Sequence, residues 1–395
     1  MRPVYLDNNA TTRVDRAVVE AMLPFFTESF GNPSSAHDFG AAPRQAVKRA
    51  REAVAAWVGA AHPDEILFTS CGTESDNAAI LAALAARPDR DEVVVSAVEH
   101  AAVLAPLEAL EARGRVKLRR IPVLRCGCID RDRYRAALSE RVALVTTMWA
   151  NNETGVIFPV EAMAEEAKAV GAVFHTDAVQ AAGREPIDLK RGAIDLISLS
   201  AHKAHGPKGA GALYVRRGFR FTPFIVGGKQ ERARRGGTEN VPAVVGFGKA
   251  AEIAATRLRG DAARMRALRD RLESGLIGRI RGAEILAAAS PRLPNTSALF
   301  VDEVEAEAIA VRLAREGIAV STGAACSSGS RTPSHVLEAM GVPDLGAVRF
   351  SLSRDTDDDD VDRALRATVE VVASLRERAP RTEREPSARR ERAHA

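Results

Sequence analysis

A chain of 395 residues is long enough for two domains, and 46% hydrophobic residues is enough for a well-packed core. The net charge of +4 is small and acidic and basic residues are interleaved, so we expect no nucleic-acid partner. No apolar run approaches the roughly 20 residues that cross a bilayer, and the first residues lack the apolar core of a signal peptide. We therefore expect a cytoplasmic protein with no membrane partner.

Apolar runs of strand length alternate with helical patterns between residues 65 and 217. Strands are predicted over 65–69, 92–97, 143–150, 172–178, 195–200 and 211–217, and helices over 75–86, 102–112 and 160–170. Continuous apolar strands separated by amphipathic helices indicate an α/β fold with a largely parallel sheet covered on both faces. Ligands of such sheets bind beyond the carboxyl ends of the strands.

A long helical stretch from about 241 to 279 leads into a second, smaller domain. Strands are predicted near 297–302 and 348–353, and helices near 305–317 and 361–375. We assign residues 16–260 to a large domain, 261–375 to a small domain, and 376–395 to a charged disordered tail. The N-terminal segment, residues 1–15, is expected to pack with one domain or the other.

Polar side chains follow five of the predicted strands. After the first strand, a small-residue turn from Ser70 to Glu74 enters a helix, where free N–H groups suit a phosphate, although an ordinary helix cap has the same signature. The later strands are followed by Glu99 and His100, Asn151 and Asn152, Asp177 and Gln180, and His202 and Lys203. Each alone has an ordinary structural explanation. A phosphate cradle, a carboxylate, an imidazole and a lysine at one sheet edge together indicate a site for pyridoxal phosphate.

Nucleotide and hydrolase motifs are a poorer match. The chain has no G-x-x-x-x-G-K-[ST], no H-E-x-x-H and no G-x-S-x-G. Gly246-Phe247-Gly248 with Ala251 resembles a dinucleotide-binding motif, but it lies in a predicted helix rather than at a strand-to-helix turn. We therefore discount a nucleotide site there.

Several short motifs occur in the order found in one enzyme family. They are YLDNNATT (5–12), GNPSSAH (31–37), GTESDN (72–77), VEH (98–100), NNETG (151–155), DAVQ (177–180), SAHKAHGPKG (200–209), GGTEN (236–240), PSHVL (333–337) and VRFSL (348–352). Together they resemble the cysteine desulfurases of the NifS and IscS kind, up to about residue 375. The resemblance implies the class V aminotransferase fold, which is pyridoxal-phosphate fold type I. It implies a large domain with a mainly parallel seven-stranded sheet and a smaller α/β C-terminal domain.

The resemblance also implies a role for each matching residue. Lys203 would be the Schiff-base lysine, Asp177 the partner of the pyridine nitrogen, and His100 a catalytic residue stacked on the ring. Arg349 would bind the substrate carboxylate with its guanidinium fork, next to Asn152. The other implied cofactor ligands are Gly72, Thr73, Asn152, Gln180, Ser200 and His202, with Thr238 from the second subunit of a homodimer.

Cys326 lies in IAVSTGAACSSGSRTPSH (318–335), a segment too rich in small residues to bury a thiol. The resemblance implies that it takes sulfur from L-cysteine as a persulfide, releases L-alanine, and passes the sulfur to an iron–sulfur scaffold protein. A transient cluster ligated by Cys326 on that scaffold is a further possibility. Ala324 stands where the family often has serine, which removes a hydroxyl near the nucleophile. The long loop and the stretch WANNETG (149–155) resemble the nitrogen-fixation NifS members.

Other functions remain open at this point. Another class V pyridoxal-phosphate enzyme, such as an aminotransferase or a selenocysteine lyase, would not need Cys326 as a nucleophile. A non-catalytic sulfur or metal carrier would need Cys326 but not Lys203. The four cysteines form no disulfide framework or four-ligand zinc site by spacing. Cys71 lies at the proposed phosphate turn, and Cys126-Gly127-Cys128 is interpreted as a turn before a helix, with redox activity or sulfur relay as the alternative.

Overall fold

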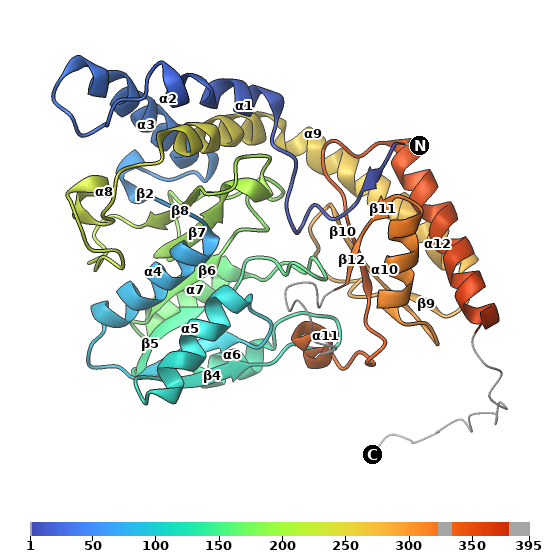
Figure 1. Ribbon diagram of the computed structural model, residues 1–395. Helices are drawn as coiled ribbons and strands as arrows, with labels where there is room; N and C mark the ends of the chain where they lie inside the picture. The colour runs from blue at the N-terminus through green and yellow to red at the C-terminus, as the bar shows by residue number, and fades with distance from the viewer. Residues whose placement is uncertain (1, 323–333, 379–395) are drawn as a thin grey trace.

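A computed structural model describes residues 2–322 and 334–378 of the chain. A seven-stranded sheet forms the centre of the larger part, and a four-stranded sheet forms the centre of the smaller part (Figure 1). The strands of the large sheet are β2 (Ile66–Thr69), β3 (Glu92–Ser96), β4 (Lys117–Ile121), β5 (Val142–Thr146), β6 (Val173–Asp177), β7 (Leu196–Ser200) and β8 (Gly211–Val215). Their order is β2-β8-β7-β6-β5-β3-β4. Every pair is parallel except those of β8, which is antiparallel to β2 and β7, so the mainly parallel seven-stranded sheet is confirmed.

Strand β4 is the one strand of this sheet for which the sequence shows no apolar run. Its sequence is KLRRI, and Lys117, Arg119 and Arg120 are exposed. It lies at the sheet edge and pairs only with β3. Charged side chains on an edge strand hinder pairing with other molecules, and they also remove the pattern by which a strand is recognised.

Helices cover both faces of the large sheet, as the continuous apolar strands predict. Val93 and Val95 of β3 pack with one cluster, which includes residues of α4 (Gly72–Ala86) and α5 (Ala101–Ala112). Val94 points to the opposite face and joins the main core. That core includes side chains of α3 (Asp38–Trp57), α6 (Arg131–Ala137), α7 (Val160–Ala169) and the first part of α9 (Val241–Arg279).

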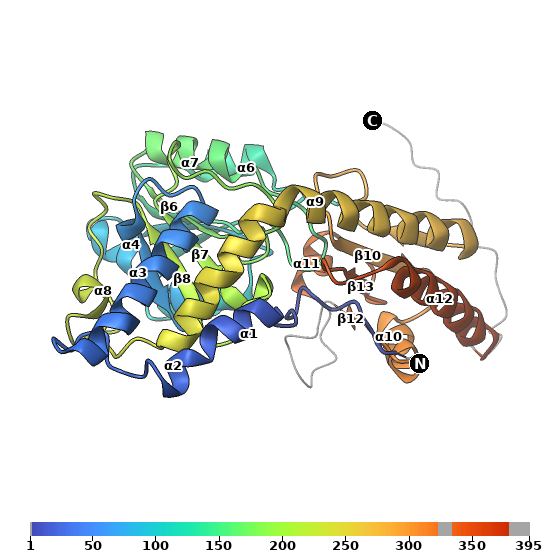
Figure 2. The same cartoon turned by 90° about the horizontal axis from the view of Figure 1, so that it is seen from above.

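Helix α9 connects the two parts of the molecule as one continuous helix of 39 residues. Phe247, near its start, belongs to the core beneath the large sheet, whereas Leu268, Leu272 and Leu276 belong to the core of the smaller part. Figure 2 shows the helix running from α1 (Arg16–Met22) and α3 to α12 (Asp358–Arg378). The domain boundary that we predict at residue 260 therefore falls inside a helix.

The smaller part is built on an antiparallel sheet of order β12-β13-β10-β9. Its elements are β9 (Ala283–Ile285), β10 (Thr296–Val301), α10 (Ala306–Arg315), β12 (Ser321–Thr322), α11 (His335–Ala339), β13 (Val348–Ser351) and α12. Arg376 donates hydrogen bonds to the carbonyls of Arg281 and Asp302 at 2.8 and 3.0 Å, and α12 continues to Arg378. Residues 376–378 are therefore helical rather than part of a tail, and residues 379–395 lie outside the described residues.

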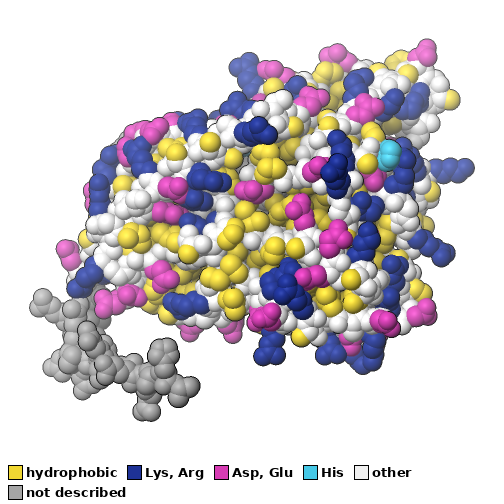
Figure 3. Space-filling model, turned by 180° about the vertical axis from the view of Figure 1, so that it is seen from behind, with side chains coloured by type: hydrophobic (Ala, Val, Ile, Leu, Met, Phe, Trp, Pro, Cys, Tyr) yellow, Lys and Arg dark blue, Asp and Glu magenta, His cyan; other side chains and the backbone are white. Residues whose placement is uncertain are grey.

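The remaining elements are short or N-terminal. They are β1 (Val4–Tyr5), which pairs with β11 (Ile318–Ala319), α2 (Pro24–Thr27), α8 (Gln230–Ala233), and the 3-10 turns η1 (Pro63–Glu65) and η2 (Ala201–Lys203). None of the helices in the described ranges combines the length and the apolar character that a membrane crossing requires. Figure 3 shows basic and acidic side chains interspersed on the face opposite to the view of Figure 1.

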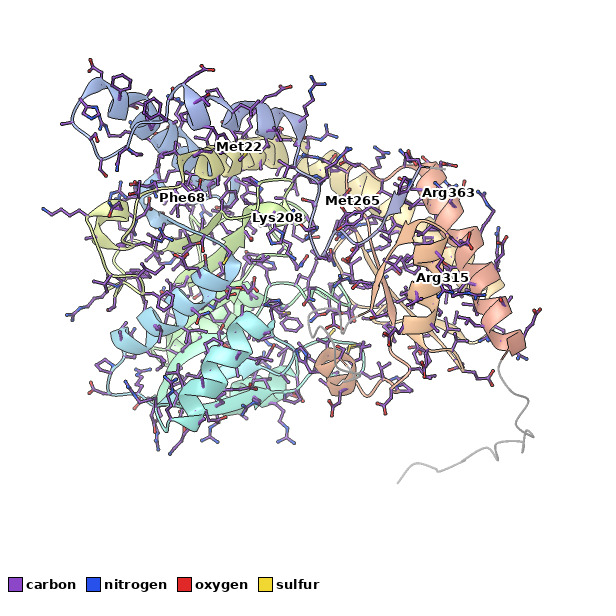
Figure 4. The ribbon with its side chains drawn as sticks, viewed as in Figure 1. Met22, Phe68, Lys208, Met265, Arg315 and Arg363 are labelled. Atoms are coloured by element: carbon purple, nitrogen blue, oxygen red, sulfur yellow. The ribbon has the colours of Figure 1, made fainter. Side chains whose placement is uncertain are left out.

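Close helix packing explains the glycine pair that resembles a nucleotide motif. A Cβ on Gly248 would lie 2.5 Å from the Cα of Ala50 in α3, and one on Gly246 would lie 2.6 Å from the sulfur of Met22. Figure 4 labels Met22 at this contact with α9. The two glycines let α9 approach its neighbours, which gives this motif a packing role.

Replacement of Gly248 by alanine is therefore expected to destabilise the protein. The added methyl group forces two helix backbones apart, which costs about 1–3 kcal/mol in unfolding free energy, more than the gain in helix propensity. Gly260→Ala in the same helix is the matched control, because a Cβ there meets nothing within 4 Å. The control should stabilise by up to about 1 kcal/mol. Urea unfolding of both variants measures the difference, and equal effects would contradict the packing account.

Candidate active site

A cavity of about 300 Å³ lies beyond the carboxyl ends of the parallel strands, beside the start of α4. Ten of the residues that the sequence places in the site line it: Gly72, Thr73, His100, Asn152, Asp177, Gln180, Ser200, His202, Lys203 and Arg349. The other lining residues are Asn9, Ala10, Cys71, Asp76, Ala102, Met148, Ala150 and Val179. Turns after β3, β5, β6 and β7 thus meet at one edge of the sheet, as the parallel topology requires.

One end of the cavity has the features of a phosphate site. Helix α4 begins at Gly72, so the backbone N–H groups of its first turn have no partner within the helix. A Cβ on Gly72 would lie 2.9 Å from a methyl carbon of Val179, so only glycine fits there without displacement. The hydroxyl oxygen of Ser200 is buried and has no hydrogen-bond partner among the described residues. These unsatisfied groups suit a phosphate at the positive end of the helix dipole.

Asp177 places a buried carboxylate at the end of β6, in the middle of the sheet. Burial raises its pKa, while the N–H of Val179 and the charges of His100 and Lys203 act in the opposite direction. The Val179 N–H donates to Oδ1 at 2.8 Å. A buried carboxylate, when ionised, attracts a positive charge on a neighbouring nitrogen more strongly than an exposed one would, because the local dielectric is low.

His100 caps the start of α5 with its ring. Its Nδ1 accepts a hydrogen bond from the N–H of Ala102 at 3.0 Å, so Nε2 is the nitrogen left for a proton. Burial lowers the pKa of His100, and the charge of Asp177 partly opposes that effect. The ring is therefore held in one orientation and is neutral when no ligand is bound.

Lys203 is held by backbone carbonyls of the N-terminal segment. Its Nζ donates to the oxygens of Asn9 and Ala10 at 2.5 and 2.8 Å. Gln180 also donates to the Asn9 carbonyl, at 3.0 Å. The motif at 5–12 includes Asn9 and Ala10, but the sequence predicts no role for them in the site. Each contributes a carbonyl oxygen, which residues of every type have.

His202 follows Ser200 in the turn after β7. Its Nδ1 lies 3.1 Å from the hydroxyl of Thr11. Burial, together with the nearby Lys203, lowers the pKa of His202 to about 4, so the ring is neutral at pH 7. It therefore contributes a hydrogen-bonding group rather than a charge.

Arg349 lies at the opposite end of the cavity. It donates to Asp7 at 2.7 Å and to the carbonyl of Asn152 at 3.1 Å, and only 6% of its side chain is exposed. Its Nε is buried with no hydrogen-bond partner among the described residues. This arrangement leaves donor capacity for an anionic group such as a carboxylate.

A group of buried polar side chains extends from Asp76 in the cavity wall to His175, and the sequence predicts no role for it. The His175 ring contacts the hydroxyls of Thr146 and Ser198 at 2.8 and 3.0 Å, and its Nε2 lies 3.6 Å from Asp76 Oδ1. Burial lowers the pKa of His175 to about 3 and raises that of Asp76 well above its usual range. The His175 ring is therefore neutral, and burial opposes a negative charge on Asp76.

Thr238 and Cys326 are the remaining site residues that the sequence predicts. Thr238 is exposed and does not line it. The neighbouring Arg235 pairs with Glu74 in the first turn of α4 at 2.9 Å, which ties the segment carrying Thr238 to the phosphate end. Cys326 lies outside the described residues.

The residues present fit pyridoxal phosphate. The α4 N-terminus with the unpartnered Ser200 hydroxyl suits its phosphate, Asp177 suits its pyridine nitrogen, and Lys203 supplies the amine. The fold and the cavity thus define an enzyme that uses this cofactor.

Known proteins support that class. The chain matches the aminotransferase class-V family over residues 4–364. It is 56% identical over 388 residues to a cysteine desulfurase of Bradyrhizobium diazoefficiens, covering 97% of this chain and 98% of that protein. It is 50% identical over 383 residues to the cysteine desulfurase NifS of Azotobacter vinelandii, covering 96% and 95%. A solved structure of a NifS-like protein has a TM-score of 0.88 at 38% identity, covering 94% of this chain and 100% of that one.

The chain belongs to the aminotransferase class-V family. Its cofactor is pyridoxal phosphate, as the sequence predicts.

Ser200→Ala is expected to weaken cofactor binding. It removes a buried donor at the phosphate end, and a hydrogen bond to a charged group contributes about 1.5–3 kcal/mol, so the dissociation constant should rise about 10- to 100-fold. Ser297→Ala is the control, because the Ser297 hydroxyl is also buried without a partner among the described residues but does not line the cavity. Equilibrium dialysis with pyridoxal phosphate measures both, and equal affinities would place the phosphate elsewhere.

Glu99→Gln is expected to change how stability depends on pH. Burial raises the pKa of Glu99 to about 8 against an ordinary 4.5, so the folded protein holds a proton that the unfolded chain releases. Stability is therefore lost as pH rises from 4.5 to 8, by up to about 1.4 kcal/mol per pH unit. The glutamine variant should lack this loss, whereas Glu316→Gln at the exposed end of α10 should keep it. Urea unfolding at pH 5, 6.5 and 8 measures the slopes, and parallel slopes in wild type and Glu99→Gln would refute the assignment.

Proposed function

We propose that this protein is a cysteine desulfurase, which converts L-cysteine to L-alanine and transfers the sulfur to an acceptor. The observation that carries the proposal is the meeting of Lys203, Asp177, His100 and Arg349 in one cavity. Identities of 50–56% to cysteine desulfurases over nearly the whole chain support it.

The bound cofactor supplies an electron sink for charge that develops at the substrate Cα. Asp177 would hold a proton on the pyridine nitrogen by charge attraction, which is strong because the carboxylate is buried. Lys203 holds the cofactor and is the amine placed to move the Cα proton. His100, anchored by Ala102 through Nδ1, presents Nε2 for proton exchange with the substrate thiol.

Arg349 binds and orients the amino acid through its carboxylate. The guanidinium is nearly fully buried, so an incoming carboxylate meets it in a low-dielectric setting. Before substrate binds, the Asp7 carboxylate accepts a hydrogen bond from Arg349 and balances its positive charge. Asn152 lies beside Arg349 and contacts the same end of the substrate.

The sulfur-transfer step is assigned to Cys326 on sequence grounds. Its thiolate attacks the sulfur of L-cysteine, and a new S–S bond forms as the substrate Cβ–S bond breaks. The sulfur remains as a persulfide on Cys326, and the three-carbon remainder keeps the electron pair of the broken bond, takes up a proton at Cβ and leaves as L-alanine. The small residues around Cys326 suit a segment that brings the thiol to the cavity and carries the sulfur out.

Iron–sulfur cluster assembly is the proposed destination of the sulfur, with a scaffold protein as acceptor. Maturation of nitrogenase is the favoured role, since the motifs resemble nitrogen-fixation members and the chain is 50% identical to a protein named NifS. Transient ligation of a cluster by Cys326 belongs to the same proposal. The enzyme is proposed to act in the cytoplasm, because a nucleophilic thiol requires a reducing compartment.

A homodimer is also proposed, in which Thr238 of one subunit reaches the phosphate of the other. Thr238 is exposed in the single chain and does not line its own cavity. Large apolar side chains nearby are exposed as well: Val226 at 84%, and Phe30 and Phe39 at 65% each. Burial of such side chains against a second copy supplies a driving force for association.

The alternative functions make different demands on Cys326. Another class V enzyme would tolerate its loss, and a non-catalytic carrier would not need the buried Asp177 or the Lys203 amine. Because Asp177 and Lys203 both line the cavity, the site favours an enzyme over a carrier.

Cys326→Ala is expected to retain the cofactor and to lose sulfur transfer. Alanine release and protein persulfide should both fall at least about 100-fold, because the nucleophile is removed while the cavity is untouched. Alanine assay and mass spectrometry of the protein after addition of L-cysteine measure this, with Cys71→Ser as the control expected to keep activity. Unchanged persulfide in Cys326→Ala would reject the assignment.

Val226→Asp is expected to weaken the dimer. A buried charge opposes association, so the dissociation constant should rise about tenfold or more. Val311→Asp in α10 is the matched control, because Val311 is also exposed but lies in the smaller part of the molecule. Sedimentation over a range of concentrations gives both constants, and no difference would exclude Val226 from the interface.

A further inference from the structure

A pair of cysteines lies outside the active-site cavity, in a tight turn between β4 and α6. The N–H of Gly127 donates to the Leu124 carbonyl at 2.8 Å, and the N–H of Leu124 donates to the Cys128 carbonyl at 2.9 Å. Gly127 has φ +76°, a conformation that side chains other than glycine rarely adopt. A Cβ there would also lie 2.9 Å from a methyl carbon of Val156. The turn therefore requires glycine between the two cysteines.

The turn brings the two thiols together on a shared hydrogen-bond network. The Cys126 and Cys128 side chains lie close enough for each to shift the pKa of the other. The Cys128 thiol donates to the Ser290 hydroxyl at 3.3 Å, and that hydroxyl donates to the Cys126 carbonyl at 2.8 Å. Ser290, which lies between β9 and β10 and far from both cysteines in the sequence, thus holds the two residues in place.

The two cysteines differ in access and in acidity. Cys126 is exposed and opens onto a shallow depression of about 820 Å³, whereas Cys128 is partly buried. Burial acts to raise the pKa of Cys126, but hydrogen bonds from the backbone and thiol of Cys128 outweigh it, so the pKa is lowered. Burial raises the pKa of Cys128. Cys126 thus has the properties of an attacking thiol, and Cys128 those of a resolving thiol.

We propose that Cys126 and Cys128 form a thiol–disulfide exchange site that reacts with low-molecular-weight disulfides. The Cys126 thiolate attacks one sulfur of the small disulfide, whose S–S bond breaks and releases one thiolate. Cys128 then loses its proton and attacks the sulfur of Cys126, which releases the second thiolate. The two protein thiols are oxidised to one disulfide, and the small disulfide is reduced to two thiols.

The ring that forms contains a single residue between its cysteines, which strains the disulfide. Strained, exposed disulfides have more oxidising potentials and are the labile ones. The site is therefore expected to be reduced under reducing conditions and to respond when small disulfides accumulate. This reaction needs neither L-cysteine nor Cys326, so it is independent of the proposed function.

The experiment uses the full-length cofactor-bound protein and oxidised glutathione. After quenching with an alkylating reagent, peptide mapping should show the segment with Cys126 and Cys128 unalkylated and lighter by two hydrogen atoms, and dithiothreitol should reverse this. Single glutathione adducts on both cysteines of the wild type, or no reaction at either, would overturn the proposal.

Two serine variants separate the roles. Cys128→Ser should accumulate a glutathione adduct on Cys126, because the resolving thiol is missing. Cys126→Ser should form an adduct on Cys128 at least about tenfold more slowly, because that thiol is less accessible and less acidic. Equal rates in the two variants would contradict the assignment of attacking and resolving thiols.

Discussion

Hydrogen bonds from the N-terminal segment hold the two halves of the cavity together. Asn8 donates to the Ser351 carbonyl in the small sheet at 2.9 Å, while the Asn9 carbonyl accepts from Lys203 at the end of the large sheet. The backbone N–H of Thr12 donates a hydrogen bond to the His202 carbonyl at 3.0 Å. The segment predicted to pack with one domain or the other thus contacts both. The distance between the lysine end and the Arg349 end of the cavity depends on this segment.

Burial governs the electrostatics of the site. Asp177 and Lys203 lie at one edge of the large sheet and Arg349 lies on β13 of the small sheet, and all three line one cavity where charges interact more strongly than in water. Burial keeps the His175 ring neutral and opposes a negative charge on Asp76. A zwitterionic amino acid and a phosphate dianion complement the charged groups that line the cavity.

Chain order and residue type predict much of the site, because parallel strands bring every residue after a carboxyl end to the same edge. Asp177 and Lys203 could be identified in this way. The carbonyl oxygens of Asn9 and Ala10 could not be identified, because residues of every type have the same backbone carbonyl. The residue pattern also did not predict strand β4. Its charged side chains suit a solvent-exposed edge and leave no apolar run. The roles of Thr238 and Cys326 come from the resemblance alone.

The central claim is that Lys203 holds pyridoxal phosphate at the carboxyl edge of the sheet. Borohydride reduction of the cofactor-bound protein, followed by proteolysis and mass spectrometry, locates the lysine directly, because reduction makes the linkage permanent. The account predicts one modified peptide, carrying the cofactor on Lys203. Modification of Lys208, five residues further along the chain and exposed, or of another lysine instead, would contradict it.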